Sequence, residues 1–284
     1  MRIDLHTHST ASDGTERPSE LVASAAGAGL DVVALTDHDT TSGWAEALAA
    51  GERLGVRVVP GMEVSCLVHG VSVHLLSYWH DPADASLVGM LDASRTSRVT
   101  RAQRMVERMS ADTGLRWEDV LAHVHGGATI GRPHIADALV AAGVVADRDE
   151  AFATLLSGRG PYFVPHTAPD PLEAIALVRA AGGVPVLAHP AASKRGSCVG
   201  DADVEAMVAV GLAGLEVDHR DHSDAERRHL RDLARSLGLL VTGSSDYHGT
   251  GKRNALGEHT TDPDVLREIE VRAGSGRADG VRGA

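Results

Sequence analysis

The stretch DLHTHSTASDG, residues 4–14, places two histidines on either side of a single threonine almost at the start of the chain. His6 and His8 lie at the end of an apolar run over residues 2–6 that predicts a short strand. In an extended strand, residues two apart point to the same side, so both imidazoles can reach one centre. A lone pair of histidines is weak evidence, and its meaning depends on what other segments bring to the same place.

Short apolar runs alternate with helical periods along most of the chain. Strands are predicted at 2–6, 31–37, 57–61, 183–190, 214–219 and 239–248, and helices at 18–27, 43–54 and 224–237. The segments MEVSCLV (62–68) and VSVHLLSY (71–78), joined at His69 and Gly70, predict a hairpin. Repeated βα units of this kind indicate an α/β fold with a parallel barrel or sheet.

The strand signal fades between residues 87 and 165, where short helices separated by Gly and Pro are predicted. We therefore expect a barrel domain formed by residues 1–86 and 166–272, interrupted by a helical insertion over 87–165. The last segment, AGSGRADGVRGA (273–284), is small, polar and rich in glycine, which is typical of a disordered tail.

Composition excludes several classes of protein. The 284 residues are 43% hydrophobic, enough for one large core or two modest ones. No apolar run approaches the roughly 20 residues of a membrane-spanning helix, and the start of the chain lacks the apolar stretch of a signal peptide, so we expect a cytoplasmic protein without a membrane partner. The net charge of −12 argues against binding long duplex nucleic acid. The two cysteines have no paired spacing, so any metal would rest on nitrogen and oxygen ligands.

Metal-binding residue types stand at or just after the predicted strand ends. They are His6, His8, His38, Glu63, His189, Asp246 and His248, with His74 reaching in from the hairpin strand. In a (β/α) barrel the strand ends converge on one face, where active sites form. Imidazole with carboxylate suits Zn, Mn or Fe, and this many ligands serve two or three ions. Glu63 is expected to bridge ions through its two oxygens.

Other polar residues receive weaker interpretations. Asp4 is expected to orient a ligand imidazole through a hydrogen bond. Asp37 and Asp39 flank His38. The sequence does not distinguish three roles for them: a cap, a hydrogen bond that supports a ligand, or a solvent-exposed residue. Seven further histidines are taken to lack strand-end placement and are interpreted as surface or local-structure residues: His123, His125, His166, His219, His222, His229 and His259.

Six motifs, in this order, resemble the signatures of the PHP (polymerase and histidinol phosphatase) family: DLHTHSTASDG, LTDHDT, PGMEVS, VSVHLLSY, VLAHP and GSSDYH. The resemblance spans nearly the whole chain. It implies a distorted (β/α)7 barrel with a helical insertion and a site for three divalent metal ions, commonly manganese, with iron or zinc as alternatives. It also assigns nine metal ligands: His6, His8, Asp13, His38, Glu63, His74, His189, Asp246 and His248. Asp13 enters this set through the resemblance alone.

The implied activity is hydrolysis of a phosphate monoester of a small nucleotide, such as a nucleoside 3',5'-bisphosphate. Metal ions lower the pKa of bound water, and the resulting hydroxide can attack phosphorus directly. Asp246, or a neighbouring histidine such as His189, could also take or give a proton, a role that the sequence does not separate from metal ligation. The alternatives are a 5'-3' exoribonuclease acting on short RNA, a metal-dependent amidohydrolase, a histidinol-phosphate phosphatase and a non-catalytic metal-binding module.

Substrate recognition is expected to use cations outside the metal cluster. GATIGRPHIADAL (127–139) supplies Arg132 and His134 at the start of a helix that could help to hold an anion. Arg101 and Arg104 are three residues apart on a predicted helix. They either bind a second phosphate or lie on a solvent-exposed helix face, and the sequence favours neither. Lys252 and Arg253 either line the mouth of the site or belong to an ordinary loop.

Overall fold

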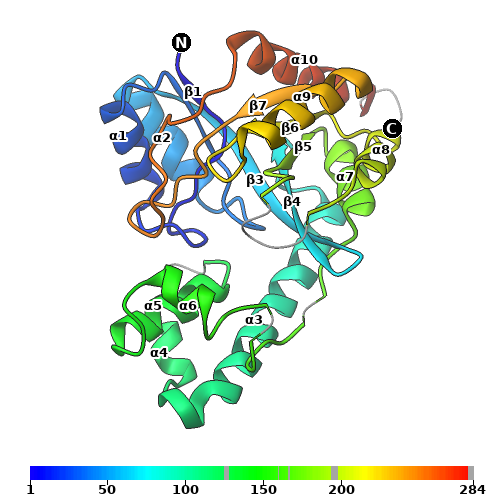
Figure 1. Cartoon of the computed structure of the whole chain (residues 1–284). Coiled ribbons are helices and arrows are strands. Elements are labelled where there is room, and N and C mark those ends of the chain that lie inside the picture. The colour runs from blue at the N-terminus through cyan, green and yellow to red at the C-terminus, as the bar shows by residue number, and fades with distance from the viewer. Residues whose placement is uncertain (125–127, 159, 166, 193–197, 281–284) are drawn as a thin grey trace.

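The computed structural model describes residues 1–124, 128–158, 160–165, 167–192 and 198–280 (Figure 1). Its strands are β1 (Ile3–Asp4), β2 (Val32–Leu35), β3 (Arg57–Val68), β4 (Val71–Tyr78), β5 (Val184–Ala188), β6 (Gly214–Asp218) and β7 (Leu240–Gly243). Its helices are α1 (Pro18–Gly27), α2 (Trp44–Leu54), α3 (Ala85–Thr113), α4 (Trp117–Leu121), α5 (Arg132–Ala141), α6 (Arg148–Ala153), α7 (Pro171–Ala180), α8 (Asp201–Ala209), α9 (Asp224–Leu237) and α10 (Pro263–Gly280).

The strands form one seven-stranded sheet in chain order. Neighbouring strands are parallel except β4, which runs antiparallel to both β3 and β5. A parallel bridge between Thr7 and Tyr247 and a 2.8 Å hydrogen bond from His8 N to Tyr247 O connect the two edges just beyond β1 and β7. The sheet is therefore a nearly closed barrel, and the predicted α/β class with a distorted (β/α)7 barrel is confirmed.

Most predicted elements are present, and α1 and α9 have the expected bounds. Ser223 and Glu226 form a capping box at the start of α9, and Gly238 ends it in the left-handed conformation. Two expectations were wrong. Residues 57–61 and 62–68 form the single strand β3, and the first part of the insertion, predicted as short helices, is the 29-residue helix α3. Gly61 permits close packing in β3 instead of a turn: a Cβ atom on it would lie 2.8 Å from Thr36 Cγ2.

Two separate hydrophobic cores are joined by the long helix α3. Near its start, Leu87 and Leu91 pack into the cluster formed by β3, β4 and the helices α7 to α9. Farther along, Met105 packs with residues such as Leu139 in a core of their own beneath the barrel. In Figure 1 this lobe of α4, α5 and α6 lies beyond one end of the barrel, and α10 lies at the other end.

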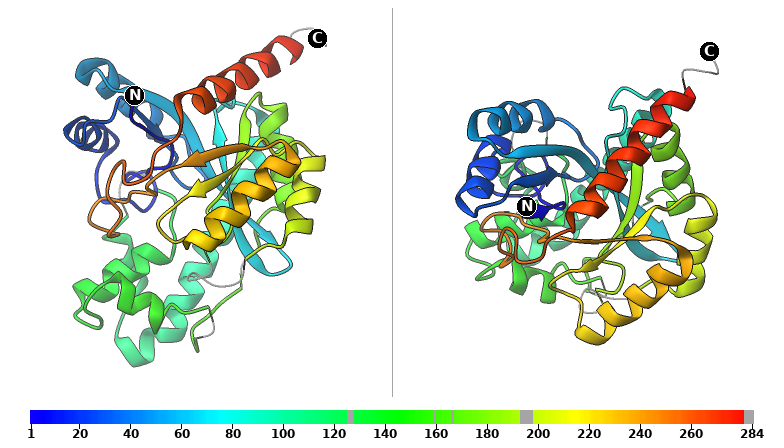
Figure 2. Two further views of the ribbon diagram at one scale, coloured as in Figure 1. Left: turned by 45° about the horizontal axis from the view of Figure 1, so that its top comes forward. Right: turned by 90° about the horizontal axis from the view of Figure 1, so that it is seen from above.

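Helix α10 crosses the end of the barrel opposite the insertion (Figure 2, right). Leu266 and Ile269 pack there against the barrel interior. The helix continues to Gly280, into the segment for which the sequence predicts a disordered tail, and residues 281–284 lie outside the described part of the chain. Within the described residues, no helix combines the length and hydropathy needed to span a membrane.

Candidate metal centre

The carboxyl ends of the strands bring the predicted ligands together on the barrel face that borders the insertion. Four groups place ligand atoms within 4.8 Å of one another. They contain all nine sequence-predicted candidates and one further residue, and they are His8, Asp13, His38 and His248; His6, His8, Glu63 and Asp246; His6, His189 and Glu216; and His38, Glu63 and His74. His74 joins them because antiparallel β4 pairs it with Ala188, at the carboxyl end of β5.

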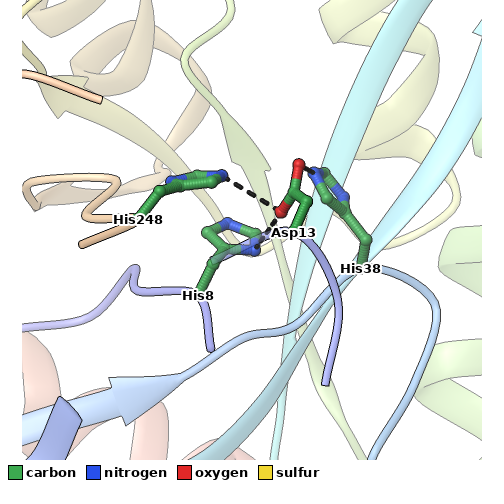
Figure 3. A group of neighbouring side chains, drawn as sticks. All are labelled: His8, Asp13, His38 and His248. Carbon is green, nitrogen blue, oxygen red and sulfur yellow. Dashed lines mark ion pairs between the residues drawn. The ribbon is translucent and has the colours of Figure 1, made fainter. Parts of the chain in front are cut away.

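Asp13 lies among three imidazoles (Figure 3). Its Oδ1 is 3.3 Å from His248 Nε2 and 3.7 Å from His8 Nδ1, and its Oδ2 is 3.8 Å from His38 Nε2. The loop that carries Asp13 is held in place by Asp37, whose carboxylate accepts hydrogen bonds from Ser9 and from Ser12. Of the alternatives for Asp37, the structure favours support for a ligand.

Glu63 divides its two oxygens between different histidines. Oε2 lies 3.1 Å from His6 Nε2 and 3.0 Å from His8 Nε2. Oε1 lies 2.7 Å from His74 Nδ1 and 3.1 Å from His189 Nε2. This arrangement suits the bridging role expected for Glu63, because each oxygen faces a separate set of nitrogens.

The arrangement of acceptor atoms fits a bound cation. His6 Nδ1 lies 3.0 Å from Glu216 Oε1, so Nδ1 donates to that carboxylate and Nε2 is the nitrogen that faces Glu63. His8 Nε2 lies only 3.0 Å from His6 Nε2. Burial lowers the pKa of His8, but Asp246 and Glu63 outweigh it and raise the pKa to about 9.

Glu216 is a buried carboxylate that the sequence reasoning missed. It accepts hydrogen bonds from His6 Nδ1, from the backbone N–H of His189 at 2.8 Å, and from Ser244 Oγ. Burial raises the pKa of Glu216, but the neighbouring charges of His6, His219 and His189 lower it far below the usual range. A signal existed, since β6 was the one parallel strand for which we assigned no candidate at its carboxyl end.

His219 and His222 are also buried, which corrects the interpretation of His219 as a residue outside the site. His219 Nε2 lies 3.5 Å from Asp246 Oδ2, and its ring lies 5.4 Å from that of His189. His222 has a local structural role, donating from Nδ1 to Val217 O and accepting at Nε2 from Ala191 N. His125 and His166 lie outside the described residues.

Asp4 supports the site through the backbone, so the expected hydrogen bond to an imidazole was wrong. Its carboxylate accepts from the N–H groups of His6, Ser245 and Gly257. Desolvation raises the pKa of Asp4 to about 6, although these hydrogen bonds act in the opposite direction and lower it. Asp4 thereby ties the end of β1 to the segment that follows β7, and it fixes the relative positions of two ligand-bearing segments.

Backbone strain is concentrated at the same strand ends. Asp39, His189 and Asp246 have φ angles of 52°, 31° and 54°, in the left-handed region that non-glycine residues seldom adopt. Such strain persists only where the surroundings hold it, and it clusters at functional sites. At Asp39 those surroundings include Arg98, which donates to Oδ2 at 3.0 Å, and Arg95, which donates to the backbone oxygen at 2.6 Å.

The insertion brings the guanidinium of Arg98 to within 3.0 Å of Asp39, the residue after the predicted ligand His38. Burial and then the charges of Arg132 and Arg98 lower the pKa of Arg101 to about 9, so these three guanidinium groups lie close together. Arg98 was not predicted. Arg104, predicted as the partner of Arg101, is exposed, because each step of three residues falls short of a full helical turn and moves Arg104 off the face that carries Arg98.

A cavity of about 390 Å³ lies between the barrel and the insertion. Asp13 and Ser12 line it from the barrel, and His134 and Arg148 line it from the insertion. Burial lowers the pKa of His134, so this imidazole is neutral near pH 7. His123, interpreted from the sequence as a surface residue, is half-buried and lines the same cavity.

Nitrogen and carboxylate atoms that face one another suit a divalent cation between them, and a cation site near Arg98 suits an anionic substrate. The fold and the site define a metal-dependent hydrolase built on a (β/α) barrel.

Comparison with known proteins identifies the family. The PHP domain model matches residues 4–125. The 3',5'-nucleoside bisphosphate phosphatase of Chromobacterium violaceum is 34% identical over 282 residues, covering 95% of this chain and 97% of that protein. A 5'-3' exoribonuclease of Haemophilus influenzae is 31% identical, covering 87% of this chain and 90% of that protein. A solved structure described as a metal-dependent phosphoesterase from Bifidobacterium adolescentis has a TM-score of 0.93 and 47% identity, covering 95% of this chain and 96% of that one. The chain belongs to the PHP family and is a metal-dependent phosphoesterase.

Proposed function

We propose that this phosphoesterase removes one phosphate from a nucleoside 3',5'-bisphosphate, with three divalent ions, manganese first among them, held by the nine predicted ligands. The observation that carries the proposal is a pair of half-buried arginines, Arg101 and Arg132, whose neighbour Arg98 contacts Asp39, the residue after the predicted ligand His38. A substrate with two separated phosphates matches both features, because one phosphate can meet the ions while the other meets the arginines.

We assign the four ligand groups, which share several members, to three ions. One group centres on Asp13 and one on His6 and His8, while the third joins His74 and His189 through Glu63. When bound, divalent ions would supply water of lowered pKa for attack on phosphorus and would neutralise the charge of the phosphate oxygens. The protein's own contribution is to hold the ligands and to exclude bulk water. Asp246 and His189, at the inner edge of the cluster, remain our candidates for proton transfer.

The arginine pair is available for an anion. Arg101 donates to Val164 O and lies over the Phe163 ring, and Arg132 donates to Leu156 O and lies over the Phe152 ring. Within the described residues, neither guanidinium has a carboxylate partner. Burial lowers the pKa of both guanidinium groups, the nearby charge of Arg98 lowers both further, and a bound phosphate would offset this repulsion.

The nucleoside part of the substrate suits the cavity that runs from Asp13 to the insertion. His134 at the start of α5 faces this cavity, and its side chain is held at Nδ1 by the backbone N–H of Gly131 at 3.2 Å. Its other ring nitrogen can therefore donate a hydrogen bond to the substrate. The cavity therefore supports the predicted substrate-binding role of His134, whereas the exposure of Arg104 removes the reason to assign it such a role.

The second candidate is 5'-3' exonucleolytic cleavage of short RNA, which is favoured by the similarity to the exoribonuclease of Haemophilus influenzae. Both substrates present a terminal nucleotide with an adjacent phosphate. An amide substrate or histidinol phosphate would leave the second cation cluster without a partner, so these alternatives rank lower.

The test is phosphate release from adenosine 3',5'-bisphosphate by protein loaded with manganese. Phosphate release from adenosine monophosphate and mononucleotide release from a short 5'-phosphorylated RNA are measured alongside, and Asp13→Ala is the inactive control. Preferential turnover of the bisphosphate supports the proposal. Comparable turnover of the RNA moves the assignment to an exonuclease, and inactivity on both with bound metal rejects a nucleotide substrate.

A further inference from the structure

The Asp246 carboxylate faces two different environments. Its Oδ1 lies 3.5 Å from Nε2 of both His6 and His8, on the side of the predicted metal ligands. Its Oδ2 lies 2.9 Å from the ammonium of Lys252 and 3.5 Å from His219 Nε2. One oxygen is thus directed to the metal cluster, and the other is held by a cation that belongs to the protein itself.

The loop that carries Lys252 is fixed over the site. Gly251 N donates to His248 O at 3.3 Å, and Asn254 Nδ2 donates to the backbone oxygens of Ser245 and Asp246 at 2.6 and 3.2 Å. Asp246 is 1% exposed, whereas the Lys252 side chain is 33% exposed. The ammonium therefore lies between the buried carboxylate and the solvent from which a substrate arrives.

Lys252 and a divalent ion would share one carboxylate. Because both are cations in a poorly solvated place, each weakens the hold of the other on Asp246. A lysine ammonium on a flexible stem can turn from a carboxylate to a nearby anion, since it is a point charge with three donors. A phosphate group approaching the metal cluster is an anion of the required kind.

We propose that Lys252 is a substrate-binding residue, whose ammonium competes with a divalent ion for Asp246 and passes to the substrate phosphate when the ion is bound. This inference rests on the proposed function in taking phosphate as the ligand. If Lys252 only oriented Asp246, the opposite result would be expected for metal binding, because the loss of Lys252 would weaken the binding of the ion.

The experiment compares Lys252→Met with Arg253→Met in the full chain. Arg253 is the neighbouring cation, exposed and 3.7 Å from Asp149, so its loss removes the same charge from the same loop. Two quantities are measured: the affinity of the metal-free protein for Mn²⁺, and the affinity of the Mn²⁺-loaded protein for inorganic phosphate. Thermal unfolding of each variant checks the fold, and Lys252→Gln provides a second neutral side chain.

For Lys252→Met we expect Mn²⁺ affinity to rise several-fold, phosphate affinity to fall about tenfold, and the KM of the bisphosphate to rise more than kcat falls. Arg253→Met should change neither affinity, and Lys252→Arg should restore phosphate binding. Unchanged or weaker Mn²⁺ binding by both neutral variants would overturn the inference. If both affinities shift as expected while no nucleotide is hydrolysed, the inference stands and the proposed substrate is rejected.

Discussion

Arg148, in the insertion, donates a 3.1 Å hydrogen bond from Nη1 to the backbone oxygen of Asp13, in the barrel. Its other guanidinium nitrogens make two 2.6 Å contacts with the carboxylate of Asp137 on α5. Arg148 also lies against the loop after β7, where a Cβ atom on Gly251 would be 2.3 Å from Nη1. The insertion therefore holds the segment that carries a predicted metal ligand.

Replacing Arg148 by Met should weaken Mn²⁺ binding and lower kcat, each by about tenfold, because supports of ligand-bearing segments commonly have effects of this size. Mn²⁺ titration of the metal-free protein and steady-state kinetics measure the two effects. Arg116→Met is the matched control, since Arg116 is exposed in the same insertion and pairs with Asp119. Normal Mn²⁺ affinity in Arg148→Met would show that the contact with Asp13 is incidental.

Glu216 provides a second prediction, about the orientation of ligands. Glu216→Gln puts an amide where a carboxylate now accepts from His6 Nδ1 and from His189 N, so the His6 tautomer is no longer fixed. We expect Mn²⁺ affinity to fall about 10- to 100-fold. Glu258→Gln, which alters the pair of the half-buried Glu258 with Arg220, should leave Mn²⁺ affinity unchanged. Equal metal binding by the two variants would argue against the role of Glu216.

Strand-end placement was enough to predict most of the metal cluster, because parallel strands bring their carboxyl ends to one face regardless of side-chain detail. It was not applied to β6, whose carboxyl end carries Glu216, and the register of β6 against β7 shifts there between Glu216 and Asp218. The shift breaks the alternation of side chains, so His219 ends up buried beside Asp246. The period-two alternation of side chains along a strand does not predict where such a register shift occurs.

Contacts between the insertion and the barrel were beyond prediction for a different reason. Arg98 contacts Asp39 across 59 positions of the chain, and Arg148 contacts Asp13 across 135. Nothing local in either sequence marks such a pairing, which depends on how α3 carries the insertion over the strand ends. The same dependence explains why Arg104 was predicted in place of Arg98.

The arginine pair gives a prediction about specificity. Arg101→Met or Arg132→Met should raise the KM for adenosine 3',5'-bisphosphate by about tenfold or more, since each removes a charge-assisted contact to the second phosphate. The KM for adenosine monophosphate should change much less, because it lacks that phosphate. Arg104→Met, on the same helix as Arg101 but exposed, is the control. Equal losses on both substrates would assign the pair a structural role.

The burial of His80, outside the metal centre, leads to a prediction of how the free energy of unfolding depends on pH. It is buried against Trp44 and contacts Ser77 through Nδ1. Desolvation lowers its pKa from 6.5 to about 4, so the unfolded state binds a proton at a higher pH than the folded state. The resulting stability is complete above pH 6.5 and is lost as the pH falls towards 4, by on the order of 3 kcal/mol.

His80→Gln cannot take up this proton, so its free energy of unfolding should fall less than that of the wild type between pH 7.5 and 4.5. Urea unfolding of metal-free protein across this range measures the difference, and the comparison cancels other titrating groups that both proteins share. His229→Gln is the control, because His229 is exposed and pairs with Asp201 on the surface. Parallel pH profiles for wild type and His80→Gln would mean that His80 is protonated alike in the folded and unfolded states, contrary to its burial.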